Sequence, residues 1–200
     1  MIRQTIVSIF DNIGPMLLIF SVIIVSLRLC YLTETKEKFI FYKEMFSLLF
    51  CLYIMILFYV VTFQDVSWST SNFVPFKEMF RYSFGSTLFY RNVIGNMIMF
   101  LPYGFFLSQF IKIHKVGKIL FLSFIASTSI EITQLLIGRV FDVDDIILNI
   151  LGGILGFYLY RFVTFINNKL PNSLKTEIFY NIIMLIFIVI LFLGFYFIEV

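Results

Sequence analysis

The sequence predicts an all-α membrane protein, a polytopic transmembrane helical bundle of about six spans. Of its 200 residues, 60% are hydrophobic and only 14% are charged, whereas soluble globular domains average about 25% charged residues. Apolar stretches of about 20 residues, the length that crosses a bilayer as a helix, recur along the whole chain. A chain of this composition cannot cover itself with a polar surface, so we expect it to fold in lipid.

Short charged segments separate six apolar stretches. We place the spans at residues 12–31, 45–63, 92–113, 119–137, 146–163 and 179–198. The first span is longer than the core of a signal peptide and is not followed by a small-residue cleavage pattern, so we expect it to be retained. Because no Gly/Ser linker or repeat interrupts the sequence, residues 1–200 are expected to form a single membrane domain.

The basic residues predict the orientation of the spans. Six spans put ten of the 15 lysines and arginines on one side, namely Arg28, Lys36, Lys38, Lys43, Lys112, Lys115, Lys118, Arg161, Lys169 and Lys175. Because short loops rich in these residues stay in the cytoplasm, both termini are expected to face outward. The net charge of +3 is then a topology signal and gives no support to nucleic-acid binding.

The cysteines and the histidine point to no cofactor and no metal. Cys30 and Cys51 fall within apolar stretches, where free, buried thiols are the usual state. His114 is the only histidine and has no soft ligand near it in the sequence, whereas zinc requires several converging ligands.

A polar stripe runs along the fourth span. Ser123, Ser127, Glu131 and Gln134 recur at intervals of four, four and three residues, which places them on one helical face. An ionised side chain inside a span costs at least about 2.5 kcal/mol on insertion scales. Glu131 is therefore expected to face the interior of the bundle.

The fifth span has a similar face. Asp145, Asn149, Gly152 and Gly156 follow one another at helical spacing. Gly152 and Gly156 form a small-xxx-small pair, which lets a neighbouring helix backbone approach closely. In the third span Pro102 removes a helix hydrogen bond and favours a kink.

Depth links the three middle spans. Asn96, Gln134 and Asn149 each lie about four residues, or about 6 Å, inside the outer end of their spans, so we expect one polar layer. The turn at residues 139–145 is expected to close over it and to form a ligand-binding site open to the outer face. The expected site residues are Arg91, Asn96, Glu131, Gln134, Arg139, Asp142, Asp144, Asp145 and Asn149.

Structural interpretations of the same residues stay open. Asparagine, glutamine and serine in spans often serve as interhelical hydrogen-bond partners, worth about 0.6 kcal/mol each. The three aspartates would then form a solvated turn that supplies an N-cap for the fifth helix. The 28 phenylalanines are expected at lipid-facing and interfacial positions.

Four sequence segments resemble the VanZ family. They are NFVPF at 72–76, NMIMFLPYGF at 96–105, EITQ at 131–134 and GRVFDVDDIILNILGG at 138–153. The resemblance covers about 45–161 and leaves the flanking spans at 12–31 and 179–198 outside. The family pattern singles out Pro75, Asn96, Pro102, Glu131, Gln134, Arg139, Asp142, Asp145 and Asn149.

The resemblance implies a multi-pass protein of the bacterial cytoplasmic membrane that is linked to low-level resistance to the glycopeptide antibiotic teicoplanin. It implies no accepted mechanism. We favour a non-enzymatic envelope protein whose outward polar pocket binds a lipid-linked cell-wall precursor or a lipoglycopeptide, with Arg91 and Arg139 meeting anionic groups. Membrane lipids are the other expected partners, and the oligomeric state stays open.

Two alternatives remain. In the first, an intramembrane enzyme acts on a lipid or lipid phosphate, with Glu131 or Asp145 as acid or base; one form of it has a hard cation at Asp142, Asp144 and Asp145. The sequence contains no phosphate-binding glycine loop, no HExxH and no GxSxG motif in its support. In the second, a small transporter uses Glu131 as a proton carrier, although no inverted repeat is recognisable.

Overall fold

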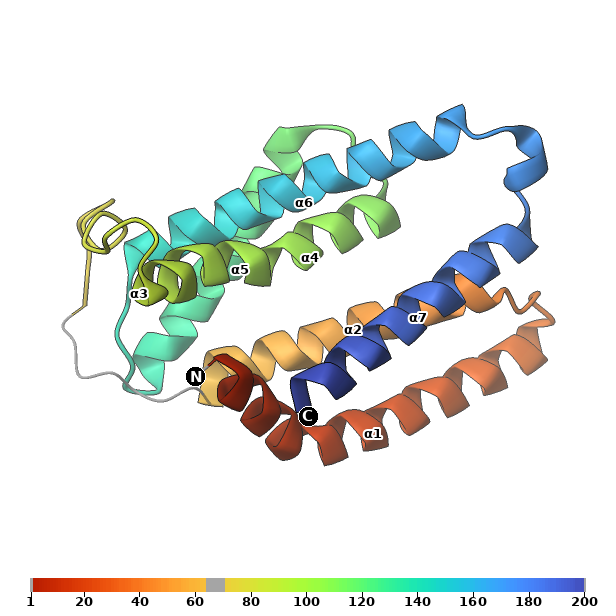
Figure 1. Cartoon of the computed structure of the whole chain (residues 1–200), viewed down its shortest axis with the longest axis horizontal. Helices are drawn as coiled ribbons and strands as arrows, with labels where there is room; N and C mark the ends of the chain where they lie inside the picture. Colours follow the sequence, from red (N-terminus) through yellow and green to blue (C-terminus); the bar gives the residue numbers. More distant parts are fainter. Residues whose placement is uncertain (1, 64–70, 200) are drawn as a thin grey trace. The chain divides into compact units, whose positions relative to one another are not determined.

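The computed structural model describes residues 2–63 and 71–199 and is built from helices (Figure 1). In chain order these are α1 (Ile2–Thr35), α2 (Phe41–Phe63), α3 (Thr87–Phe89), the π-helical turn η1 (Tyr90–Ile94), α4 (Gly95–Ile111), α5 (Val116–Leu136), α6 (Val143–Lys169), the 3-10 turn η2 (Asn172–Leu174) and α7 (Glu177–Glu199). In the two described ranges, the β-type pairing is one isolated parallel bridge between Asn72 and Asp142.

Six spans are confirmed. The candidate membrane-crossing segments among the described residues are Asp11–Thr35, Phe41–Thr62, Thr87–Ile111, Val116–Leu136, Val143–Lys169 and Glu177–Gly194. The third begins five residues before the expected position, and the fifth extends beyond its expected boundaries at both ends. Polar residues prolong these helices past the apolar stretch from which the sequence boundaries were taken. The fold is all-α, and the chain is a multi-pass membrane protein.

Two compact units make up the chain. Unit 1 contains α1, most of α2 and α7. Unit 2 extends from Val61 to Asn168 and contains the last residues of α2 together with α3, η1, α4, α5 and most of α6. The expectation of a single membrane domain stays a prediction.

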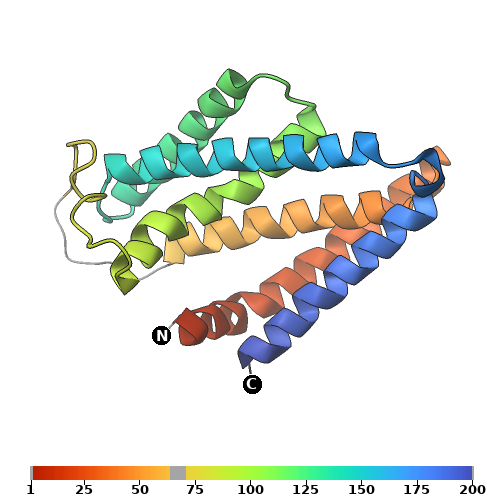
Figure 2. The same ribbon diagram turned by 45° about the horizontal axis from the view of Figure 1, so that its top comes forward.

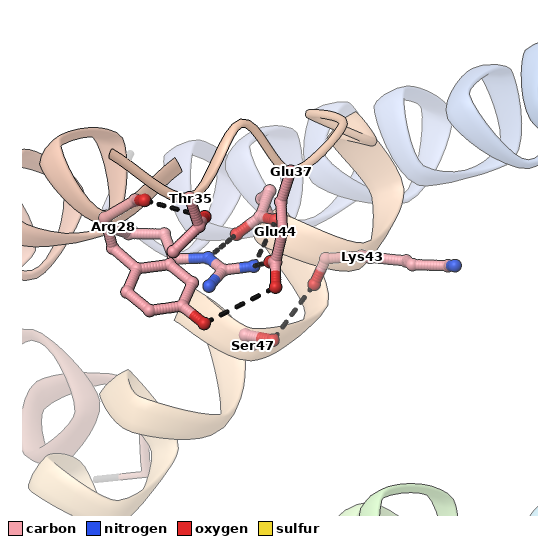
Figure 3. A network of polar contacts seen from close by, with 7 residues as sticks. Arg28, Thr35, Glu37, Lys43, Glu44 and Ser47 are labelled. Carbon is pink, nitrogen blue, oxygen red and sulfur yellow. Dashed lines mark hydrogen bonds and ion pairs between the residues drawn. The ribbon is translucent and has the colours of Figure 1, made fainter. Parts of the chain in front are cut away.

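In unit 1, α1 runs antiparallel to α2 and α7 (Figures 1 and 2). The α1–α2 connection is fixed by the Arg28 guanidinium, which donates to both carboxylate oxygens of Glu44 over 2.8 and 3.1 Å and lies 3.5 Å from Glu37. Figure 3 shows the guanidinium between these two carboxylates. A bidentate pair of this kind is among the stronger charge-assisted contacts.

The last helix joins the same end of unit 1. Lys38 donates to the Glu177 carboxylate over 2.7 Å, and the Tyr42 amide donates to the Asn181 side-chain oxygen over 3.0 Å.

The cysteines are free, as expected, but Cys30 is exposed on the surface of α1 rather than buried.

In unit 2, α4 and α6 run in the same direction and pack backbone to backbone (Figures 1 and 2). A Cβ atom added at Gly152 or Gly156 would overlap the carbonyl oxygen of Met97 or Leu101, respectively. A Cβ atom at Gly104 would overlap the carbonyl oxygen of Gly153. The close approach predicted for the small-residue pair is confirmed, and α4 is the helix that approaches.

An apolar cluster fills the end of unit 2 nearest the α4–α5 connection. Ile113, Ile119 and Phe157 are buried there, and Leu107, Leu122 and Ile154 pack against them. Ser108 is buried near this cluster, whereas Glu131, Asp144 and Asn149 are buried towards the opposite end, where α5 ends and α6 begins.

Candidate functional site

The interior face of α5 is the predicted one. Ser123, Ser127 and Glu131 are exposed by 0%, 0% and 2% of their surface, and Gln134 is half-buried. The four-residue spacing therefore identified the polar face of the helix correctly. Glu131 lies near the C-terminal end of α5, and its carboxylate accepts a hydrogen bond from the Asp142 amide over 2.9 Å.

A glycine turn follows α5. Gly138 has φ +82°, the left-handed conformation that glycine adopts without strain. The Gly138 amide donates to the Leu135 carbonyl over 3.2 Å, and the Arg139 amide donates to the Gln134 carbonyl over 2.8 Å. These two bonds define a Schellman motif, in which side chains at the positions of Gln134 and Arg139 commonly make an apolar contact.

Here those two positions carry polar side chains, and both bind the same backbone group. The Gln134 amide donates to the Val61 carbonyl over 3.3 Å, and the Arg139 guanidinium donates to it as well. We expected Arg139 to meet an external anion. Instead, one guanidinium nitrogen of Arg139 binds the Val61 carbonyl near the end of α2. Its other N–H groups are left for further contacts.

Asp142 connects three segments at the start of α6. It directly precedes the first residue of the helix, and its Oδ1 accepts from the Asp144 amide over 2.9 Å, which makes it the N-cap. The same oxygen accepts from the Asn72 side chain over 2.9 Å. Burial raises the pKa of the Asp142 carboxyl, whereas the hydrogen bonds from Asn72 and the Asp144 amide act in the opposite direction.

Asp144 holds the loop between α2 and α3. Its side chain accepts hydrogen bonds from three backbone amides, those of Phe76, Glu78 at 2.8 Å and Met79 at 2.9 Å. With 1% of its surface exposed, Asp144 contradicts the interpretation of a solvated acidic turn. Phe76 has φ +67°, which is costly for a bulky side chain, and the bond to Asp144 stabilises that conformation.

Asn72 is a structural residue that we did not expect in the site. Its amide donates to the Phe141 carbonyl over 2.8 Å, and its carbonyl accepts from the Val143 amide over 3.1 Å. Its side-chain oxygen accepts from the Val74 amide over 3.1 Å. An asparagine that bonds the backbone two residues later is a typical turn former, so its position in the NFVPF segment was an available signal.

Asp145 pairs with Asn96. The Asn96 side-chain amide donates to the Asp145 carboxylate, so α4 and α6 meet at the polar end as well as at the glycines. Asp145 is the third residue of α6 and does not cap it.

The π-helical turn η1 directly precedes α4, and such turns often lie at functional sites. The helix continues through Pro102, and the irregular backbone lies earlier, in η1.

Asn149 lies deeper on α6. Its side-chain nitrogen donates to the Ser127 hydroxyl over 2.9 Å. Its side-chain oxygen is buried without a hydrogen-bond partner among the described residues, as are the hydroxyls of Ser123 and Thr128. An unpaired buried acceptor costs about 1–3 kcal/mol. These three atoms are therefore available to bind a further polar group.

The expected polar layer is therefore a set of separate contacts. Asn96 binds Asp145, Gln134 binds the Val61 carbonyl and Asn149 binds Ser127. Arg91 lies exposed in η1, and no ion pair within the described ranges involves it.

The three aspartates of the turn point to different partners. Asp142 bonds Asn72, Asp144 bonds the 76–79 backbone and Asp145 bonds Asn96. Within residues 2–63 and 71–199, no group of three histidine, cysteine or acidic side chains is arranged to hold a metal ion. The interpretation of these aspartates as a cation site gains no geometric support.

Known proteins resemble this chain over the part that contains the site. The model of the VanZ/LLP1 family matches residues 45–166. Protein VanZ of Enterococcus faecium is 34% identical over 113 residues, which are 54% of this chain and 66% of that protein. The chain thus spans slightly less than two thirds of that relative. No solved structure matches the chain. The polar contacts around Asn72, Asn96, Glu131 and Asp142 all lie within the matched residues, and the chain belongs to the VanZ/LLP1 family.

Proposed function

We propose that this protein acts in the bacterial cytoplasmic membrane as a non-enzymatic envelope protein that lowers susceptibility to teicoplanin. In this proposal its outward polar end binds a lipid-linked or lipid-tailed ligand, or alters the access of that ligand to the outer leaflet. The observation that carries the proposal is the gathering of four acidic side chains at one end of unit 2, within the family-matched residues. They are Glu131, Asp142, Asp144 and Asp145.

The basic residues support the outward placement of this end. Lys112 and Lys115 lie in the α4–α5 connection and Lys118 lies in the first turn of α5, whereas the acidic residues lie at the other end of that helix. Since basic connections stay in the cytoplasm, the acidic end faces outward. With six spans, the proposed orientation has both termini outside.

The hydrogen bonds favour a binding role over catalysis. The Glu131 carboxylate accepts the Asp142 amide, and the Asp145 carboxylate accepts the Asn96 side chain. Both candidate acid–base groups therefore serve protein contacts that hold the α5–α6 turn and α4. The N–H groups of Arg139 that do not bind Val61 are the donors best suited to an anionic group of a ligand.

Thiol labelling tests the orientation. In a background with Cys30→Ser and Cys51→Ser, Ile137→Cys should react with a membrane-impermeant reagent in intact cells, because Ile137 is exposed directly after the span that ends at Leu136. Val116→Cys, exposed at the other end, should react only after permeabilisation. The reverse pattern would overturn the orientation.

Antibiotic susceptibility tests the function. Expression in a susceptible Gram-positive host should raise the teicoplanin inhibitory concentration severalfold and leave vancomycin, which lacks a lipid tail, nearly unchanged. Arg139→Ala and Asp145→Asn should abolish the effect at equal membrane abundance. Glu34→Gln, outside the family-matched residues, is the matched control and should retain it. A well-expressed wild-type protein without effect on teicoplanin would contradict the proposal.

A further inference from the structure

We propose that the loop at residues 71–86 is a membrane-inserting element whose phenylalanines enter the acyl region of the adjoining leaflet. The loop joins the span that ends at Thr62 to the span that begins at Thr87, so it lies at a membrane face. Only the identity of that leaflet, the outer one, rests on the proposed function.

Four phenylalanines project from this loop. Phe73, Phe76, Phe80 and Phe84 are exposed by 68%, 50%, 80% and 89% of their surface. In water this exposed apolar surface would be unfavourable. Lipid removes that cost, because acyl chains solvate aromatic rings and the headgroup region favours aromatic side chains.

Hydrogen bonds fix part of the loop backbone. The Phe80 amide donates to the Phe76 carbonyl over 3.2 Å, a single helical turn that brings the two ring centroids to 6.3 Å. Asp144 binds the Phe76, Glu78 and Met79 amides from the buried side. These bonds hold the backbone of residues 76–80 in place, and the Phe76 and Phe80 side chains extend from it with 50% and 80% of their surface exposed.

The charges of the loop match a lipid surface. Lys77 and Arg81 alternate with the phenylalanines and are both exposed. The Arg81 guanidinium binds Glu78 over 3.0 Å and has 68% of its side chain exposed. Basic groups beside aromatic rings suit a bilayer, in which phosphates lie directly above acyl chains. With Glu78 bound to Arg81, Lys77 leaves the loop with a net positive charge, which favours anionic bilayer lipid as the partner.

Fluorescence quenching tests the insertion. The chain has one tryptophan, Trp68, so Trp68→Phe provides a background in which Phe80→Trp or Phe84→Trp is the sole reporter. The protein is reconstituted in vesicles of phosphatidylglycerol and phosphatidylcholine, with or without bromine on the acyl chains. Either reporter should show blue-shifted emission that falls severalfold in the brominated vesicles.

His114→Trp is the matched control, because His114 is an exposed aromatic residue in the basic α4–α5 connection. Its emission should be red-shifted and nearly unquenched. Red-shifted, unquenched emission from both loop reporters would overturn the insertion. Quenching together with unchanged teicoplanin susceptibility would uphold the insertion and reject the proposed function, and the two proposals therefore fail separately.

Discussion

Asp142 and Asp144 lie two residues apart and bind different segments of the chain. Asp142 caps α6 and bonds Asn72, and Asp144 binds the backbone of residues 76–79. Both carboxylates thus accept hydrogen bonds from the segment at residues 72–79. Together they attach this segment to the end of unit 2 where α6 begins.

Removing the Asp144 carboxylate should release that loop. Asp144→Ala leaves three part-buried amides without an acceptor, at a cost of up to about 1–3 kcal/mol each when water does not replace it. Asp142→Ala should cost less, about 1 kcal/mol for the cap plus the bond from Asn72. Thermal unfolding in detergent should rank the two variants in this order. Equal unfolding temperatures for Asp144→Ala and the wild type would contradict the assignment.

Two uncharged variants of Glu131 test the hydrogen bond between its side chain and the Asp142 amide. Its carboxylate accepts the Asp142 amide from a nearly fully buried position. Glu131→Gln keeps an acceptor oxygen, whereas Glu131→Leu removes it and leaves the amide unpaired. The glutamine variant should therefore unfold at the higher temperature of the two. If both variants unfold together, the contact with Asp142 does not stabilise the turn.

The residue scale also shows how far the sequence predicts the site. Helical spacing identified the face that contains Ser123, Ser127 and Glu131, because spacing depends on one helix alone. It could not assign the partner of Arg139, which is a backbone carbonyl 78 residues away. Every residue carries such a carbonyl, so residue type contains no signal for this contact.

At the scale of helices, the crossing of α4 over α6 determines the shape of unit 2. The glycines of α6 were predictable as a packing surface, and their partner, α4, was not. The π-helical turn η1 before α4 was not predicted. It is only one turn long, so it does not change the hydrophobic pattern from which the span was identified.

A methyl group at the crossing should separate α4 and α6. Gly156→Ala places a Cβ atom on the Leu101 carbonyl, which is backbone and cannot rotate away. Gly117→Ala is the control, because nothing lies within 4 Å of its added Cβ and alanine favours a helix by about 1 kcal/mol over glycine. Thermal unfolding in detergent should show a large loss for Gly156→Ala and none for Gly117→Ala. The opposite ranking would contradict the packing of the two helices.

At the scale of the whole molecule, the family-matched residues 45–166 leave out α1 and α7. These two helices, which the sequence presents as separate flanks, contact each other within unit 1. The number of spans was predictable because each span is a local property. The pairing of the first and last spans was not predictable, because apolar helices of similar composition carry no sequence feature that selects one partner helix over another.

Cross-linking tests that pairing. In a background with Cys30→Ser and Cys51→Ser, Lys38→Cys combined with Glu177→Cys should be joined by a short thiol-reactive reagent, because the two native side chains bond over 2.7 Å. Asn12→Cys combined with Glu177→Cys is the control. Residue 12 lies near the other end of α1, about 35 Å from Thr35 along that helix at 1.5 Å per residue. Cross-linking of the control pair alone would contradict the antiparallel arrangement.

The bonds between Lys38 and Glu177 and between Tyr42 and Asn181 each join residues 139 positions apart, and this separation orders assembly during synthesis. A chain is made from its N-terminus at about 5–20 residues per second. Unit 2 is complete once Asn168 has been added, whereas the segment that contains Lys38 and Tyr42 binds a helix that has not yet been translated. A nascent chain that stops before Glu177 therefore contains every residue of the polar end and still lacks the last helix of unit 1.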